Sequence, residues 1–557
     1  MRITLVTVLV AALGSAAGAL SSVPVPAVTL MPAARPGSAA HDYPFFATDI
    51  VLSNYGYVEE EFSVDGVANT YQPAPPNANA EIASRGIKYR SRLLVRRPAQ
   101  ANRFNGVVVV EWLNVTNGYD TDVLWLYEKE FLIREGYAWV GVSAQNVGVS
   151  RPPNGLKVWS PARYGTLDID GGGQVTGDAL GYDIYSQAAM AIRSVPRVLG
   201  GLRARHVIAA GQSQSAGRLV TYLNGVHERD PVFDAAMLTV NTGLIRTDLS
   251  IPVIKVLSET EANTSRNQPD SARIRVWIVT GSTHSEQYSL ISRAAFLKRD
   301  LNLEAVDPCE TPARSRVEIR YVYNAAIDAL VKWKTAGTAP PSGPPLTFAG
   351  DVLQRDPHGN ALGGIRLAEI AAPVATEAAG VCGLGGKHVP FDTATINSLY
   401  PTHDDYVSQV RAASEAMVKA GFLLPADAAQ TIDAARRSIY GRQLTCGPLC
   451  ADVRQFPANP SSILLSRQTA ALLIKDGETL VKLLDAATLS IAEAYTSTDA
   501  GIAAGKFKAA ASGLQSFIDK TAEFERKKSL APETAALLVN QAKTLKDRVI
   551  AQAQTTR

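Results

Sequence analysis

The chain has 557 residues, of which 46% are hydrophobic and 19% are charged, and its formal net charge at pH 7 is +3. This length allows a large buried core and more than one domain. The near-neutral charge, without a basic run or a basic–aromatic patch, argues against a nucleic-acid partner.

The N-terminus has the pattern of a cleavable secretory signal. Arg2 supplies a positive charge, residues 3–13 an apolar core, and residues 17–19 an Ala-Gly-Ala cleavage site. The apolar run is too short to cross a bilayer comfortably, so we expect no stable membrane span. We therefore expect residues 1–19 to be a signal peptide, residues 20–45 a flexible leader rich in Pro and Ala, and the mature protein to be secreted or periplasmic.

Strand-like and helix-like segments alternate between about residues 57 and 290. We expect strands at 89–95, 107–111, 137–142, 207–210, 235–240, 253–257 and 275–280, and helices at 121–135 and 182–195. This alternation predicts an α/β fold, in which helices cover both faces of a mostly parallel sheet. Ligand sites in such sheets lie at the carboxyl ends of the strands.

A long loop separates the strand that ends near Val142 from the helix after Gly181, and it contains Trp159 and Tyr164. Long loops in a compact domain are usually functional or disordered. We interpret this one as a flap that brings its aromatic side chains to the substrate, with a structural surface loop as the alternative. Trp112 completes the predicted substrate pocket, although core packing is the default for a tryptophan.

The segment from Val207 to Arg218 predicts a nucleophile elbow. A short apolar strand runs into a tight turn, and a helix follows from near Ala216. Small residues, Gly211 and Ser215, stand two positions on either side of Ser213, which lets strand and helix approach closely. Ser213 is therefore the candidate nucleophile. The alternatives are a register centred on Ser215, or a serine-rich turn that only caps the helix.

An oxyanion hole for such a serine needs two backbone N–H donors. One is expected from Gln214, the residue after the nucleophile. The other should come from the loop that follows the strand at 107–111, where Leu113 and Asn114 are the candidates.

A serine nucleophile also needs a base, and in this architecture the chain order is serine, acid, histidine. Among the seven histidines, His284 follows the expected strand 275–280 through a short turn, which places it at the carboxyl edge of the sheet. His403 is the main rival, and His358 and His388 remain open.

The acid is expected just after the strand that ends at Ser258. Glu261 is preferred, because related hydrolases usually place this acid three residues beyond a small residue at the strand end. Glu259 is the alternative acid. Two acids so close together are otherwise typical of a solvated turn.

The four cysteines are Cys309, Cys382, Cys446 and Cys450, an even number that is compatible with two disulfides in an exported chain. Three pairings are possible, and the sequence does not choose between them. The close spacing of Cys446 and Cys450 favours a local disulfide over a metal half-site, since no second half lies nearby.

The pattern changes after residue 300. A helix is expected at 321–334, helices again at 403–421 and 426–440, and three amphipathic helices at 465–486, 496–523 and 531–553, the middle one broken near Gly501 or Gly505. We therefore expect a catalytic domain at 46–442 with cap or insert segments within 300–400, a linker at 443–460, and a helical module at 461–557. A dimerising coiled coil is the rival interpretation of this module, but its apolar spacing is not a clean heptad.

Several segments together resemble the alpha/beta hydrolase domain family of large secreted or periplasmic bacterial proteins. They are Gly211-Gln-Ser-Gln-Ser-Ala-Gly-Arg218, Ser258-Glu-Thr-Glu261, Trp277 to His284, Trp159 to Gly165, Gly359 to Arg366 and Tyr400 to His403. The resemblance covers roughly residues 50 to 440 and implies an alpha/beta-hydrolase fold and ester hydrolysis without a cofactor, but no particular substrate. The segment 465–553 is weakly similar to small extracellular three-helix modules.

The chain departs from the family pattern at two positions. Glu261 stands where an aspartate is more usual, and Ile278 stands where relatives tend to carry an acid. A glutamate can serve as the triad acid with a longer reach.

The leading interpretation is a secreted serine hydrolase that cleaves carboxylic esters through a Ser-His-acid triad and an acyl-enzyme. The expected partner is a small-molecule or polymer-derived ester, and no metal or organic cofactor is expected. Two alternatives stay open: an acyltransferase that uses the same triad, and a non-catalytic binding protein on a hydrolase scaffold. In either case the helical module is a candidate for contact with a partner or a surface.

Overall fold

The computed structural model describes residues 22–262, 268–309, 312–438, 440–442, 477–497 and 499–555. The predicted signal peptide, the predicted linker, the start of the predicted helical module, and Cys446 and Cys450 lie outside the described residues.

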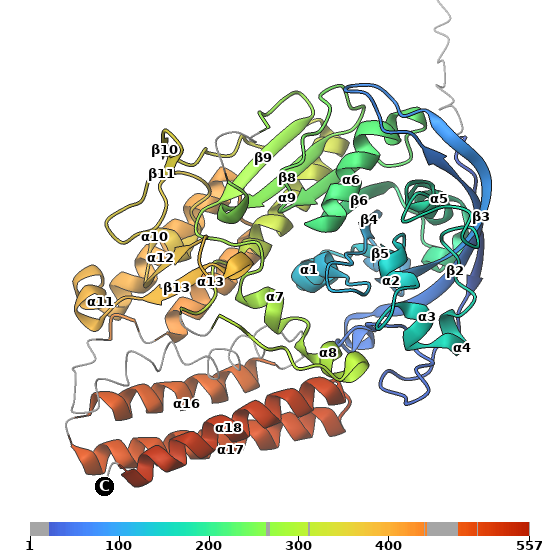
Figure 1. Ribbon diagram of the computed structural model, residues 1–557. Helices are drawn as coiled ribbons and strands as arrows, with labels where there is room; N and C mark the ends of the chain where they lie inside the picture. Colours follow the sequence, from blue (N-terminus) through green and yellow to red (C-terminus); the bar gives the residue numbers. More distant parts are fainter. Residues whose placement is uncertain are drawn as a thin grey trace, which may run out of the picture.

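A nine-stranded sheet forms the centre of the protein (Figure 1), with the strand order β1-β2-β3-β5-β4-β6-β7-β8-β9. The strands are β1 (Ala27–Leu30), β2 (Tyr57–Tyr71), β3 (Ile82–Pro98), β4 (Val107–Trp112), β5 (Ala138–Val142), β6 (His206–Gln212), β7 (Ala235–Thr239), β8 (Val253–Ser258) and β9 (Ile274–Val279). The strands from β5 to β9 pair in parallel, whereas β1, β2 and β3 pair antiparallel with their neighbours. The predicted α/β fold with a mostly parallel sheet is confirmed.

The helices that pack on the sheet follow from the order of its strands. The larger ones are α1 (Val123–Arg134), α5 (Gly181–Ser194), α6 (Gln214–Gly225) and α9 (Ile319–Ala336). The chain steps from β4 to β5 in one direction, and then returns past β4 to β6 in the other. Because such crossovers are right-handed, α1 and α5 cover opposite faces of the sheet. α6 packs beside α5, where Ser186 and Tyr222 share a hydrogen bond of 3.0 Å between their hydroxyls.

The first strand differs from our expectation of a flexible leader at 20–45. Residues 27–30 pair with residues 62–65 of β2, and the side chains of Tyr43 and Phe45 are fully buried. The Pro and Ala content of this segment concealed a short edge strand and an aromatic anchor, whose burial outweighs the entropy of ordering the chain.

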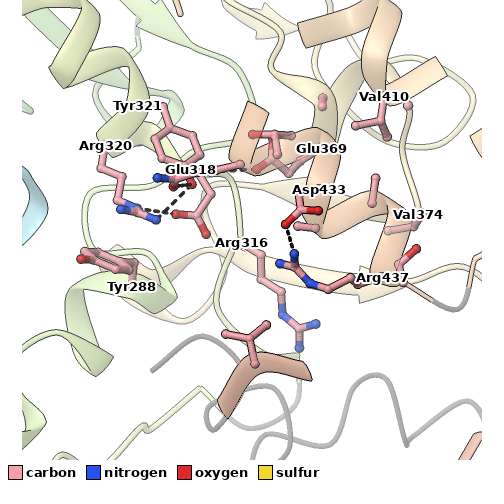
Figure 2. Close-up of a pocket in the computed structure, with 18 of the residues that line it drawn as sticks. Tyr288, Arg316, Glu318, Arg320, Tyr321, Glu369, Val374, Val410, Asp433 and Arg437 are labelled. Atoms are coloured by element: carbon pink, nitrogen blue, oxygen red, sulfur yellow. Dashed lines mark hydrogen bonds and ion pairs between the residues drawn. The ribbon is translucent and has the colours of Figure 1, made fainter. Parts of the chain in front are cut away.

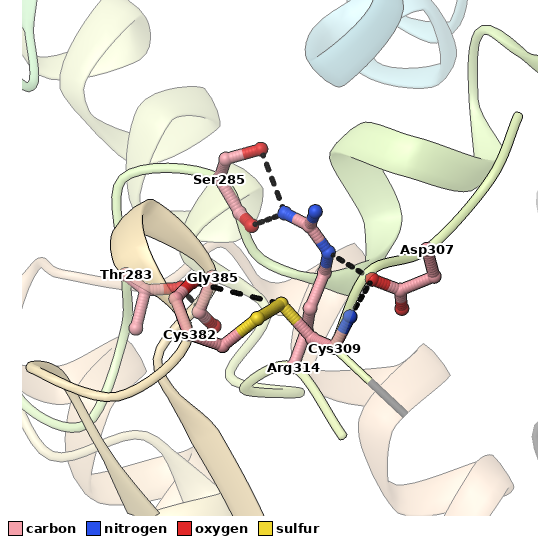
Figure 3. Close-up of a disulfide and its surroundings, with 7 residues drawn as sticks. All are labelled: Thr283, Ser285, Asp307, Cys309, Arg314, Cys382 and Gly385. Carbon is pink, nitrogen blue, oxygen red and sulfur yellow. Dashed lines mark hydrogen bonds and ion pairs between the residues drawn. A yellow bond between two sulfur atoms is a disulfide. The ribbon is translucent and has the colours of Figure 1, made fainter. Parts of the chain in front are cut away.

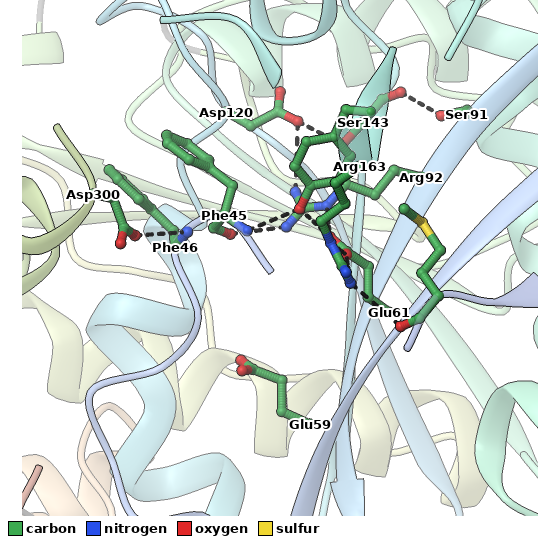
Figure 4. Close-up of polar contacts among 12 residues, drawn as sticks. Phe45, Phe46, Glu59, Glu61, Ser91, Arg92, Asp120, Ser143, Arg163 and Asp300 are labelled. Carbon is green, nitrogen blue, oxygen red and sulfur yellow. Dashed lines mark hydrogen bonds and ion pairs between the residues drawn. The ribbon is translucent and has the colours of Figure 1, made fainter. Parts of the chain in front are cut away.

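A buried polar network joins β2 and β3 to the long loop after β5 (Figure 4). Glu61 of β2 accepts hydrogen bonds from the guanidinium groups of Arg92 and Arg163, and its Oε1 lies 2.7 Å from the hydroxyl of Tyr164. Arg92 also donates to the carbonyl of Phe45 at 2.8 Å. Each of these charges therefore has a partner, which buried charges require.

The rest of the catalytic-domain segment is made of short elements around the sheet. The helices are α2 (Asn146–Val149), α3 (Leu156–Trp159), α4 (Pro161–Tyr164), α7 (Gln287–Ile291), α8 (Ala294–Leu301), α10 (Ala368–Ala371), α11 (Thr393–Leu399), α12 (His403–Ala420) and α13 (Pro425–Arg437). Two small hairpins pair β10 (Phe348–Ala349) with β11 (Val352–Leu353), and β12 (Ala375–Ala378) with β13 (Lys387–Pro390). A disulfide joins Cys309 to Cys382, so the turn between β12 and β13 is linked to the chain that follows α8.

Three long helices, α16 (Glu478–Thr496), α17 (Ala500–Arg526) and α18 (Pro532–Thr555), pack around their own apolar core. α17 is continuous through Gly501 and Gly505, so the break expected there is absent, because neighbouring helix turns and burial override the low helix propensity of glycine. α18 lies against α8 (Figure 1), where Arg299 donates to Glu533 at 2.8 Å. Within the described residues, no helix has the length and apolar character needed to cross a membrane.

Candidate active site

The turn between β6 and α6 places Ser213 at the carboxyl end of a central strand. Its backbone angles, φ 56° and ψ −114°, are ones that a residue with a side chain rarely adopts, at a cost of about 1–3 kcal/mol. Hydrogen bonds hold this conformation, from Ser213 N to the carbonyl of Thr239 at 2.9 Å and from Gly217 N to the carbonyl of Ser213 at 3.0 Å. The sharp turn presents the hydroxyl above the edge of the sheet, as a nucleophile elbow does.

The two small residues that flank the turn have separate physical reasons. A Cβ atom on Gly211 would lie 3.0 Å from the backbone N of Ala216, so any side chain there would push against the start of α6. The Ser215 hydroxyl is buried, donating to the Gln212 carbonyl at 3.0 Å and accepting from the Gln212 N–H at 3.1 Å. Because Ser215 is used inside the turn, the register centred on Ser213 is the one whose hydroxyl reaches the site.

The three predicted triad side chains lie together. His284 Nε2 lies 2.7 Å from Ser213 Oγ, and His284 Nδ1 lies 2.5 Å from Glu261 Oε1. The His284 and Glu261 side chains are 16% and 8% exposed, so solvent reaches the imidazole while the carboxylate is mostly shielded. This chain of hydrogen bonds lets a serine hydroxyl pass its proton to an imidazole that a carboxylate orients.

The turn after β8 decides which of the two glutamates reaches the histidine. Glu261 Oε2 accepts hydrogen bonds from Ser258 N at 3.0 Å and from Ser258 Oγ at 2.5 Å, which directs Oε1 toward His284. Glu259 instead accepts from Gly281 N at 2.8 Å and from the Arg355 guanidinium at 2.7 Å. The structure therefore brings Glu261, and not Glu259, to His284.

The two backbone N–H groups that we expected to supply the second oxyanion donor are bonded to other parts of the chain. The N–H of Leu113 donates to Val142 at 3.3 Å and the N–H of Asn114 to Thr121 at 3.0 Å, so both backbone groups are already engaged. The reason is that the chain after β4 continues to pair before it turns away. Gln214 begins α6, where a helix N–H has no partner within the helix itself. Asn114 stays close through its side chain, whose Nδ2 donates to the Gln212 carbonyl at 2.8 Å.

A buried carboxylate, that of Glu111, holds the start of α1 against β4 and β5. Glu111 of β4 accepts from the N–H groups of Leu124 and Trp125 at 2.9 and 3.2 Å, and from Trp139 Nε1 at 3.0 Å. Burial raises the pKa of Glu111 to about 8, with a further rise from Asp122. Glu111 thus fixes the start of α1, which forms one side of the cavity next to Ser213.

A pocket of about 330 Å³ opens at Ser213 and His284, and Asn114 and Gln212 also line it. A pocket of this size lies near the lower end of small-molecule sites, which are typically about 300–1,000 Å³. It accommodates a small group rather than a long chain.

The three aromatic residues predicted to line the substrate pocket lie elsewhere, so that prediction needs correction. Trp112 is fully buried, with its ring centroid 4.7 Å from that of Tyr185, and Trp159 stacks on His41 at 4.3 Å. Tyr164 is fully buried, and its hydroxyl donates to Glu61 at 2.7 Å. The physical reason is that large aromatic side chains gain most by filling the core.

The pocket wall comes instead from segments that sequence reasoning did not connect. Arg293, Arg314 and Leu384 line it. The Cys309–Cys382 disulfide lies beside Arg314 (Figure 3) and joins the segment that contains Leu384 to the chain just before Arg314. Ser285, directly after His284, donates its N–H to the Leu384 carbonyl at 3.0 Å. An even number of cysteines was the one sequence signal for this wall, but the sequence left their pairing open.

The rival histidines lie away from Ser213. His388 is buried and its Nδ1 lies 2.5 Å from Glu377 Oε1. His403, at the start of α12, lies 2.7 Å from the Tyr440 carbonyl. His358 packs against Phe391, with ring centroids 5.1 Å apart.

A second and larger cavity, of about 1140 Å³, lies between the catalytic-domain segment and α16 (Figure 2). Arg320 stacks between Tyr288 and Tyr321 there and pairs with Glu318 at 2.8 Å. None of the three predicted triad residues lines this cavity, so the candidate chemistry belongs to the smaller pocket. Within the described residues, no cluster of three or more His, Cys, Asp or Glu side chains is arranged to hold a metal ion.

Comparison with known proteins places the fold. The family model for the alpha/beta hydrolase domain matches residues 29–433. No curated protein matches the chain. Among solved structures, a lidless alpha/beta serine hydrolase from Xanthomonas campestris is 11% identical, with 44% of this chain and 97% of that one covered and a TM-score of 0.24. A glucuronoyl esterase from Solibacter usitatus is 9% identical, with 46% and 81% covered and a TM-score of 0.25.

At such low identities and scores, nothing about the substrate of this chain follows from those two structures. The family model is stronger evidence, because it covers the elbow, the three side chains that meet there and all of the sheet except the first two residues of β1. The protein belongs to the alpha/beta hydrolase domain family.

Proposed function

We propose that the protein is an exported serine hydrolase that cleaves carboxylic esters through Ser213, His284 and Glu261. The observation that carries the proposal is the continuous hydrogen-bonded path from Ser213 Oγ to His284 Nε2 at 2.7 Å, and from His284 Nδ1 to Glu261 at 2.5 Å. The strained backbone of Ser213 adds support, because strain of this kind persists where it positions a reacting group.

In the proposed first half-reaction, Ser213 Oγ attacks the ester carbonyl while His284 Nε2 takes the hydroxyl proton. Glu261 stabilises the imidazolium that forms, and the N–H of Gln214 stabilises the oxyanion. Collapse of the tetrahedral intermediate breaks the bond to the alcohol, which leaves with the proton from His284, and Ser213 stays acylated.

In the second half-reaction a water molecule gives a proton to His284 and attacks the acyl-enzyme. The acid product leaves, and the proton returns to Ser213. None of these steps needs a group beyond the chain and water. The Cys309–Cys382 disulfide supports export, because disulfides persist in oxidising compartments.

The test is hydrolysis of 4-nitrophenyl acetate and butyrate by the purified protein, beside Ser213→Ala and the matched control Ser215→Ala. We expect Ser213→Ala to lower kcat/KM by about a thousandfold or more. A fluorophosphonate probe should label the wild type and Ser215→Ala, but not Ser213→Ala. If the wild type neither turns over an ester nor takes the label, the proposal fails and a binding role replaces it.

A further inference from the structure

The walls of the pocket at Ser213 carry an unbalanced charge. Two positively charged side chains, Arg293 and Arg314, line it together with His284. No aspartate or glutamate is among the lining residues. Hydroxyl and amide groups supply most of the remaining polar surface, including those of Asn117, Ser289 and Ser292.

The charge of Arg314 is already compensated. Its Nε donates to Asp307 at 2.7 Å, and its Nη1 donates to the Ser285 carbonyl at 2.8 Å (Figure 3). These contacts fix Arg314 beside the disulfide, so its guanidinium serves the architecture of the wall.

Arg293 differs, because its Nε is buried and no residue that the structure describes accepts a hydrogen bond from it. Glu286 Oε2 accepts hydrogen bonds from Ser289 N at 3.0 Å and from the Tyr127 hydroxyl at 3.4 Å. Burying part of a guanidinium without a partner costs free energy, which a ligand anion can recover.

The surroundings of Arg293 show that its charge acts on the pocket. Tyr127 lines the pocket, and burial raises the pKa of its hydroxyl well above the usual value, while the positive charge of Arg293 opposes that rise. The same opposition acts on Tyr119. The positive charge of Arg293 therefore reaches a side chain of the pocket wall, where the negative charge of Glu286 acts in the opposite direction on the same pKa.

We propose that Arg293 binds a carboxylate of the substrate, so that the preferred substrates are small esters that carry an anionic carboxylate. A carboxylate fits better than a doubly charged anion such as a phosphate monoester, because the single positive charge of one guanidinium balances one negative charge, and its planar fork matches a carboxylate with two hydrogen bonds. The small volume of the pocket sets the distance: the anionic group must lie within the same 330 Å³ as the scissile carbonyl. This inference rests on the proposed ester hydrolysis at Ser213.

The test compares esters that differ only in charge. One pair places the carboxylate on the acyl side, 4-nitrophenyl hydrogen adipate against its methyl ester, and the other on the alcohol side, 4-acetoxybenzoate against its methyl ester. The value of kcat/KM is measured for each ester with the wild type, Arg293→Gln, Arg293→Lys and the control Arg411→Gln, a half-exposed arginine of α12, at low and at high salt.

In at least one pair, we expect the wild type to favour the anionic ester by about tenfold or more. Arg293→Gln should remove that preference, chiefly by raising KM for the anionic ester, and Arg293→Lys should keep part of it. Added salt should weaken the preference, since it screens the ion pair. Arg411→Gln should leave it unchanged.

Turnover of the neutral esters with no preference in either pair overturns the role of Arg293 while the hydrolase proposal stands. A preference that Arg293→Gln leaves intact overturns it equally. If none of the four esters is turned over and the fluorophosphonate probe labels no serine, the hydrolase proposal itself fails, and the inference fails with it.

Discussion

Two regions of this molecule hold shielded arginine nitrogens in opposite ways. In the network between β2 and β3, Glu61 meets both Arg92 and Arg163, and each guanidinium has a carboxylate partner (Figure 4). In the pocket beside Ser213, no aspartate or glutamate lines the wall, and no described residue accepts a hydrogen bond from the buried Nε of Arg293. In our proposal, arginines that pair with a carboxylate of the protein stabilise the fold, whereas Arg293 binds a carboxylate of the substrate.

The same division separates two glutamates that are nearly adjacent in sequence. Glu259 accepts from Gly281 N, Ala379 N and Arg355, all of which are parts of the framework. Glu261 instead directs one oxygen to His284. Neighbouring carboxylates on one turn thus serve stability and, in our proposal, chemistry.

The largest expected effect tests the different roles of Glu259 and Glu261. Glu261→Gln should lower kcat/KM for 4-nitrophenyl esters by about a thousandfold to ten-thousandfold, because the imidazole loses the carboxylate that orients it. Its midpoint of urea unfolding should change little. Glu259→Gln, the matched control, should unfold at lower urea but keep fluorophosphonate labelling. The opposite pattern would make Glu259 the acid of the site.

The next largest effect tests the buried polar network around Glu61. Glu61→Leu should lower the free energy of unfolding by about 3–5 kcal/mol, because it leaves two buried guanidinium groups without their carboxylate. Glu60→Leu is the control, since Glu60 pairs with Arg97 and its side chain is 31% exposed. The control should cost about 1 kcal/mol or less. If both variants lose the same free energy of unfolding in urea, the buried ion pairs of Glu61 contribute no more to stability than the partly exposed pair of Glu60.

A smaller effect concerns the link between framework and pocket. Replacing Cys309 and Cys382 by Ala opens a loop of 73 residues and should lower the free energy of unfolding by about 2–4 kcal/mol. Because Leu384 and Arg314 lose their tether, KM should rise more than kcat falls. Treating the wild type with a reductant is the matched control. An unchanged KM in both would show that the wall keeps its shape without the disulfide.

The parts of the site that could be predicted depend on local chain geometry. The apolar run before Gly211 and the small residue at 215 announce a sharp turn, and the order serine, acid, histidine narrows the partners to residues at strand ends. His284 and Glu261 both satisfy that rule, and the structure brings them to Ser213.

Other parts were hidden because pairing in space is invisible in one dimension. The charged residues of β2 and β3 look solvent-exposed in sequence, yet Glu61, Arg92 and Arg96 are buried because they pair with one another or with nearby carboxylates. The aromatic residues Trp112 and Tyr164 suggested a substrate pocket, but core packing took them. Arg293 could not be singled out from the sequence, because its proposed role depends on a buried Nε without a hydrogen-bond partner among the described residues, which only the structure shows.

The loop from Cys382 to Gly385 is held to the rest of the protein by one disulfide and by bonds from Thr283, Ser285 and Ser315. It forms part of the pocket wall, yet it belongs neither to the elbow nor to the nine-stranded sheet. Part of the pocket wall and the proposed reacting groups therefore lie on separate stretches of chain. A library confined to this loop is the economical route for redesign, since it can retune which esters fit while the reacting groups keep their scaffold.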